Sequence, residues 1–158
     1  MRARAWLDEV RQSAARIEDI VREIRALEQA HERVEAWVSS GSGGPRPRNA
    51  TGDPTATQAQ RRMAELEPLI AMRRRSLEEH QELVGSALAV LSLVADEVGT
   101  RDSLALELYY VDGADTWSEV AQEMRVSLRT AQRCRERAID WLESHSPLRP
   151  WDGNNSGT

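Results

Sequence analysis

The chain has 158 residues, is 40% hydrophobic and 30% charged, and carries a formal charge of −5. Phenylalanine is absent and helix-favouring Leu, Ala, Glu and Arg are common, which predicts an all-α protein. The single cysteine, Cys134, excludes an internal disulfide framework. No stretch resembles a signal peptide, and the longest aliphatic run, residues 86–95, is shorter than the ~20 residues that span a bilayer. We therefore expect a cytoplasmic protein without a membrane segment.

Residues 1–38 are predicted to form one long amphipathic helix. Apolar residues recur in steps of three and four from Leu7 to Ile24, and again from Leu27 to Val38. This spacing places them in a single stripe along a helix. A helix of this length cannot bury its stripe alone, so we expect it to pair with another helix of the same chain or of a second copy.

A linker and a second long helix are predicted to follow. Residues 39–57 are rich in Gly, Pro, Ser and Thr and contain no aliphatic side chain larger than that of Ala, as in a flexible linker. Pro68 lies inside the predicted helix 58–98 and should kink or break it. The apolar stripe of this helix is predicted to consist of Ala59, Met63, Leu66, Ile70, Leu77, Val84, Leu88, Leu91 and Val94. An antiparallel hairpin of the two long helices is the simpler arrangement, and a coiled coil between two chains is the alternative.

Residues 99–143 are predicted to form three short helices, the first of which ends at Tyr110 before the turn VDGAD. Thr116 is placed to cap the second helix, and Glu119 to complete a capping box. Ser127 is placed to cap the third helix after the turn RVS. Residues 144–158 have the composition of a disordered tail.

The last two of these helices follow the pattern of a helix-turn-helix, whose second helix enters the major groove of DNA. Apolar residues from both helices, from the turn and from the helix before them should form a common core. The predicted core residues are Leu106, Leu108, Tyr109, Val120, Ala121, Met124, Val126, Ala131, Cys134, Ala138 and Leu142.

Residues 125–137 contain five arginines and one glutamate, a local excess of positive charge in an acidic chain. With the apolar face inward, Arg129, Gln132 and Arg133 should point outward, and Arg and Gln can form bidentate hydrogen bonds with guanine and adenine edges. Neighbouring hydroxyl and guanidinium groups are placed for phosphate contacts. An ordinary solvated helix face is the alternative. The predicted contacts to double-stranded DNA are Ser127, Leu128, Arg129, Thr130, Gln132, Arg133, Arg135 and Arg137.

The stretch LALELYYVDGADTWSEVAQEMRVSLRTAQRCRERAIDWL, residues 104–142, resembles the fourth conserved region of sigma-70-type transcription factors, which binds promoter DNA. The shared features are the Tyr-Tyr pair, the acidic-Gly turn, Trp-x-Glu-Val-Ala, Val-Ser-x-Arg-Thr-Ala-x-Arg and the closing Ala-Ile-x-x-Leu. The whole chain is similar to phage-encoded regulators of the RinA/ArpU kind, which activate late genes. The resemblance implies base contacts by Arg129, Gln132 and Arg133, and bacterial RNA polymerase as a partner. The chain lacks a recognisable segment for a second promoter element, which favours an activator over a complete sigma factor.

Two other functions are compatible with this pattern, and a second copy of the chain is a further possible partner. A phage small terminase subunit also joins a helix-turn-helix to long oligomerising helices, although its DNA-binding part is usually N-terminal. A coiled-coil scaffold protein is the second alternative, and the long helices leave a homodimer open. The three histidines are scattered, and no metal-ligand spacing or phosphate-binding loop is present, so we predict no catalytic residue, metal or cofactor.

Overall fold

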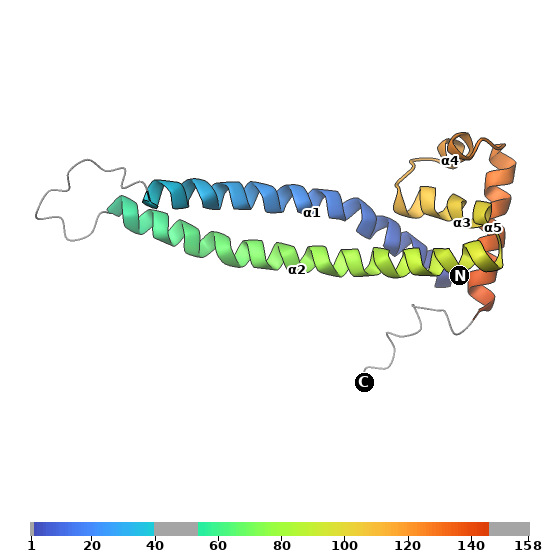
Figure 1. Ribbon diagram of the computed structural model, residues 1–158, viewed down its shortest axis with the longest axis horizontal. Helices are drawn as coiled ribbons and strands as arrows, with labels where there is room; N and C mark the ends of the chain where they lie inside the picture. Colours follow the sequence, from blue (N-terminus) through green and yellow to red (C-terminus); the bar gives the residue numbers. More distant parts are fainter. Residues whose placement is uncertain (1, 40–53, 146–158) are drawn as a thin grey trace, which may run out of the picture. The chain divides into compact units, whose positions relative to one another are not determined.

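The computed structural model describes residues 2–39 and 54–145, and all regular structure in these ranges is helical (Figure 1). The elements are α1 (Arg2–Ser39), α2 (Pro54–Glu97), α3 (Thr100–Leu106), the π-helical segment η1 (Glu107–Val111), α4 (Trp117–Met124) and α5 (Leu128–Ser144). The prediction of an all-α chain that begins with long helices is confirmed. Across the described ranges, no helix combines the length and the apolar character that crossing a membrane requires.

Most of the predicted linker and tail lie outside the described residues. Residues 39–57 were predicted to be a linker, whereas α1 extends to Ser39 and α2 already begins at Pro54. α2 then continues through Pro68 as one helix, so of the predicted kink or break, the break does not occur. Pro68 is exposed, whereas Leu66 and Ile70 on either side of it are buried, so the lost backbone hydrogen bond lies on the solvent side of the helix.

The chain divides into two compact units, and each long helix contributes to both. The α5 unit comprises Met1–Ile17 and Glu79–Thr158, and the two-helix unit comprises Glu18–Glu78. This division differs from the predicted segments, which assigned each long helix to a segment of its own. In α1 the apolar stripe crosses this boundary in an ordinary step of four, from Ile17 to Val21, so the sequence of α1 does not mark the division.

In the two-helix unit, α1 and α2 pair antiparallel within the chain. His31 Nε2 lies 3.3 Å from Glu67 Oε1, and Arg73 Nε, further along α2, lies 3.0 Å from Glu23 Oε2, which is earlier in α1. The Arg73–Glu23 pair is partly exposed, and such an ion pair contributes at most about 1 kcal/mol. The buried apolar side chains between the helices therefore contribute most of the stability of this pairing. They are Ile20, Ile24, Leu66 and Ile70.

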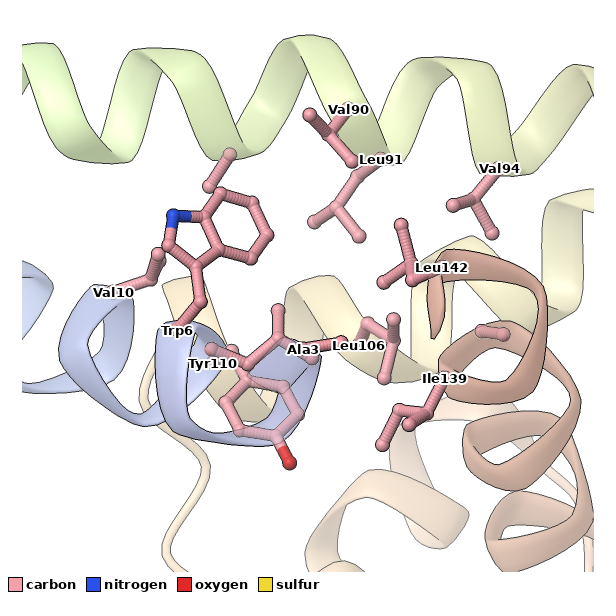
Figure 2. Packing of buried hydrophobic residues seen from close by; sticks show 13 residues of the cluster. Ala3, Trp6, Val10, Val90, Leu91, Val94, Leu106, Tyr110, Ile139 and Leu142 are labelled. Atoms are coloured by element: carbon pink, nitrogen blue, oxygen red, sulfur yellow. The ribbon is translucent and has the colours of Figure 1, made fainter. Parts of the chain in front are cut away.

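The larger hydrophobic core of the α5 unit joins α1, α2, α3, η1 and α5 (Figure 2). Trp6 of α1 is only 4% exposed, and its indole ring lies between α1 and α2, with Leu142 of α5 nearby in the same interior. Fully burying one large apolar side chain contributes about 1.5–3 kcal/mol. The first turns of α1 are therefore a structural part of the unit that contains α5. The core residues are Ala3, Trp6, Leu7, Val10, Ala87, Val90, Leu91, Val94, Leu106, Tyr110, Ala138, Ile139 and Leu142.

A second core lies between α4 and α5 and agrees with the predicted packing of these helices. Val120 and Ala121 of α4 are buried against Ala131 and Cys134 of α5, with Ala105 of α3. Three predicted members, Leu106, Ala138 and Leu142, belong to the larger core instead. Partly buried side chains complete the second core. They are Leu108, Tyr109, Ala114, Trp117, Met124 and Val126.

A π-helical turn ends the helix that was predicted to stop at Tyr110. In η1 the Asp112 N–H donates to the Glu107 carbonyl at 2.9 Å, which is the wider spacing of a π-helix. Arg11 of α1 donates from Nη1 to the Tyr109 carbonyl and, at 2.9 Å, to the Ala114 carbonyl. One arginine side chain thus satisfies two backbone acceptors at this helix end, and it fixes α1 against the segment before α4.

Candidate nucleic-acid interface

Two hydrogen bonds between side chains and the backbone fix the start of α4. The Thr116 Oγ1 accepts a hydrogen bond from the Glu119 N–H at 3.2 Å, which confirms Thr116 as the N-cap. The Glu119 carboxylate accepts from the Asp115 N–H at 2.9 Å, one residue earlier than a capping box requires. The two reciprocal bonds still satisfy two backbone donors and so define where α4 begins.

The connection between α4 and α5 depends on Arg125 in a left-handed conformation. Its φ is 56° and its ψ is 44°. The Val126 N–H donates to the Ala121 carbonyl at 3.0 Å, and the Arg125 N–H donates to the Gln122 carbonyl at 3.1 Å, which is the pattern of a Schellman motif. Glycine is usual at this position, so the sequence contained no signal for this turn geometry.

The backbone conformation of Arg125 predicts a gain in stability from glycine. Left-handed geometry costs an L-residue with a side chain roughly 1–2 kcal/mol, part of which glycine recovers. We expect Arg125→Gly to raise the free energy of unfolding by about 0.5–1 kcal/mol in urea denaturation. Arg125→Ala removes the same charge and keeps the strain, so it should show no such gain. Equal stabilities of the two variants would contradict a backbone origin.

The start of α5 is capped as predicted. The Ser127 Oγ accepts a hydrogen bond from the Thr130 N–H at 3.1 Å, and the two hydroxyl oxygens lie 2.9 Å apart. Ser127 is exposed and Thr130 half-buried, so both hydroxyl groups border the solvent at the N-terminal end of the helix. The predicted phosphate contacts by these hydroxyls stay a prediction.

The first two turns of α5 present a polar face away from the core. Arg129, Gln132 and Arg133 are exposed, and none of them forms a hydrogen bond or ion pair with the residues that the structure describes. Ala131 and Cys134 are fully buried on the opposite side, and Leu128 is 42% exposed beside the polar face. We call Arg129, Gln132 and Arg133 the reading face. Their outward orientation agrees with the sequence analysis.

Arg137, which was predicted to contact phosphate, forms an ion pair with a buried carboxylate while its own side chain stays 60% exposed, and the phosphate contact stays a prediction. Its Nε donates to Asp102 Oδ1 at 2.9 Å, and Asp102 is only 5% exposed in the first turn of α3. This hydrogen bond and the charge of Asp102 raise the pKa of Arg137 above its ordinary value. The ion pair connects α5 to α3, so Arg137 stabilises the position of α5 whatever α5 binds.

Cys134 lies next to this ion pair and has no reactive character. It is fully buried, and the Arg137 Nη2 lies 3.5 Å from its sulfur. Burial, followed by the charge of Asp102, raises the pKa of the thiol. A buried protonated thiol behaves as a small apolar side chain, which agrees with the core role expected for this residue.

Arg135, also predicted to contact phosphate, belongs to a column of stacked side chains. Its guanidinium carbon lies 4.8 Å from the centre of the Trp117 ring, and Trp117 stacks on Tyr109 with ring centres 4.6 Å apart. Arg11 lies 4.0 Å from the centre of the Tyr109 ring. Because each ring has two faces, the order of the column is Arg11, Tyr109, Trp117 and Arg135. It connects α1, η1, α4 and α5 through cation–π and stacking contacts.

In the described ranges, no group of three or more His, Cys, Asp or Glu side chains is placed to hold a metal ion.

No protein-family model, no curated protein and no solved structure matches the chain. The α5 surface itself carries exposed arginine, glutamine and hydroxyl groups on a capped helix.

Proposed function

We propose that this chain binds double-stranded DNA in a sequence-specific manner and regulates transcription, with α5 as the helix that contacts the bases and α4 as its support. One observation carries the proposal. Arg129, Gln132 and Arg133 project without a partner in the described structure from the outward side of a helix whose other side is buried. A solvated helix face can carry such side chains, but base-edge donors placed together at the N-terminal half of a capped helix also suit a base-contacting helix.

The chemistry of the reading face suits the major groove. The groove is about 12 Å wide and admits an α-helix, whose N-terminal residues contact base edges in helix-turn-helix proteins. Arginine donates two parallel hydrogen bonds to guanine, and glutamine pairs in the same manner with adenine. Ser127 and Thr130 at the start of α5 suit a phosphate oxygen, because the N-terminal end of a helix favours an anion.

The distribution of charge along α5 favours one orientation. Both arginines of the reading face lie in the first two turns, whereas Asp140, on the same outward side, is exposed further along the helix. The chain as a whole is acidic, so general attraction to the DNA backbone is weak and binding depends on this local surface. The N-terminal half of α5 is therefore the part that should enter the groove.

The resemblance of residues 104–142 to the fourth region of sigma-70-type factors supports a role in transcription. With the similarity to RinA/ArpU regulators, it leads to the specific proposal of a phage or prophage late-gene activator that acts with bacterial RNA polymerase. A phage small terminase subunit would use the same surface to bind packaging-site DNA.

The proposed function is tested by selection followed by a promoter assay. Purified protein should enrich a short common sequence from a random duplex library. A promoter that carries this sequence, fused to a reporter in a bacterial host, should change its output when the protein is expressed. A terminase subunit would enrich a sequence and leave the reporter unchanged. A scaffold protein would enrich no sequence, and this result would contradict DNA recognition altogether.

A further inference from the structure

Arg4, in the first turn of α1, reaches the outward side of α5. Its Nη2 lies 2.8 Å from each carboxylate oxygen of Glu136. The same carboxylate accepts hydrogen bonds from Arg135 Nε and Nη2 at 3.1 and 3.0 Å. The Ala3 N–H also donates to Glu143 at 2.8 Å, so the start of α1 is fixed to α5 at two points. We call Arg4, Glu136 and Arg135 the arginine–carboxylate cluster.

The cluster borders the reading face. Glu136 follows Arg133 by three residues and Gln132 by four, so it lies one helical turn further along the same side of α5. Two guanidinium groups surround one carboxylate, and the cluster keeps an excess positive charge. Although burial opposes it, hydrogen bonds from Arg135 and Arg4 hold the pKa of Glu136 below its ordinary value. The charge of the carboxylate is thus neutralised by two guanidinium groups, three of whose four hydrogen bonds go to Oε1.

Of the two arginines in the cluster, Arg4 has the greater freedom to bind an anion. The Arg135 side chain is 22% exposed and stacks on Trp117, whereas the Arg4 side chain is 46% exposed. Arg4 uses only its Nη2 to contact Glu136, which leaves the Nε and Nη1 protons to donate elsewhere. An arginine held in this way is ordered before it binds, so little side-chain entropy is lost on binding.

We infer that Arg4 binds a phosphate of the DNA backbone beside the groove that α5 enters, held there by Glu136. The inference rests on the proposed function and adds the first turn of α1 to the interface. Side chains that flank a helix in the major groove approach the phosphates at the groove edge, and arginine–phosphate hydrogen bonds are charge-assisted. Glu136 is then a positioning residue, because it acts on DNA only through Arg4 and Arg135.

An alternative explanation for an effect of Arg4 on DNA binding predicts a different result in a double-mutant cycle. Arg4 could act on DNA only by neutralising Glu136, whose free carboxylate would repel phosphates. In that case, Arg4→Gln would weaken binding in the parent protein and have no effect in the Glu136→Gln background. A direct phosphate contact instead makes Arg4→Gln weaken binding in both backgrounds.

The experiment measures affinity for the selected duplex and for an unrelated duplex at several salt concentrations, with the full-length chain. We expect Arg4→Gln to weaken both complexes by the same factor and to reduce the slope of log K against log salt by about 0.9. In the Glu136→Gln background, where Arg4 is no longer held, the loss of affinity should be smaller but still present. Arg4→Lys keeps the charge and should keep the slope. Arg22→Gln, which removes another exposed α1 arginine, should leave the slope unchanged.

Two results separate this inference from the proposed function. An Arg4→Gln effect that disappears in the Glu136→Gln background, or an unchanged salt slope in both backgrounds, would overturn the phosphate contact while DNA binding by α5 stands. A parent protein that binds neither duplex would overturn the proposed function itself, and the phosphate contact with it. Circular dichroism of each variant shows whether the helices are retained.

Discussion

Replacing Trp6 with alanine is expected to lower the free energy of unfolding of the α5 unit by about 3–5 kcal/mol. Trp6 is 4% exposed and belongs to the core that joins α1, α2 and α5 (Figure 2). The substitution removes the largest side chain of that core and leaves a cavity that three helices cannot close without moving their backbones. Urea denaturation followed by far-UV circular dichroism measures the effect without relying on fluorescence from the remaining tryptophans.

Trp37 provides the matched control for this prediction. It lies near the other end of α1, in the two-helix unit, and is only partly buried. Trp37→Ala removes the same side chain from the same helix and should cost clearly less. A loss below about 1 kcal/mol for Trp6→Ala, the size of an ordinary surface effect, would show that α1 is not part of the core around α5.

The helices and their caps could be predicted from the sequence because their causes are local. An apolar residue every three or four positions specifies one face of a helix, and this pattern alone located α1 and α2. Thr116 and Ser127 were recognised as caps because a hydroxyl group before a helix-forming stretch can accept a hydrogen bond from the backbone three residues later. The polar face of α5 followed from the same periodicity.

The tertiary partners of charged residues could not be predicted in this way. Asp102 and Arg137 are 35 positions apart, and Arg4 and Glu136 are 132 apart. No period connects such residues, so Arg135 and Arg137 were assigned to phosphate from their local charge alone. In the structure Arg137 pairs with a buried carboxylate and Arg135 lies between a ring and Glu136. The local sequence did not indicate these partners, and the two phosphate contacts stay predictions.

The buried face of α2 shows a second limit of periodicity. The predicted stripe included Leu88, which is 41% exposed, and omitted Ala87 and Val90, which are buried. A single apolar stripe is expected on a helix that packs against one other helix. Within the α5 unit the core around α2 contains side chains of α1, η1 and α5 together, so the buried face turns away from the stripe that was predicted for a simple pair.

Replacing Arg129 and Arg133 with alanine is expected to abolish sequence-specific DNA binding while the fold is retained. A bidentate arginine–guanine contact contributes about 1–3 kcal/mol of discrimination, so each single substitution should weaken the selected duplex by roughly 5- to 150-fold. Both side chains are exposed and form no ion pair with described residues, so their loss should leave the unfolding midpoint unchanged. Fluorescence anisotropy with the selected duplex and a scrambled duplex measures the two affinities.

Two further arginines show whether the effect depends on position. Arg75, exposed on α2 and without a described ion pair, is the matched control, and Arg75→Ala should bind both duplexes as the parent protein does. Arg137→Ala should instead destabilise the fold, because it leaves buried Asp102 without its partner. Equal losses on both duplexes for Arg129→Ala and Arg133→Ala would reassign these side chains to phosphate. Unchanged affinity for the selected duplex would exclude α5 as the base-contacting helix and would identify the reading face as an ordinary solvated helix face.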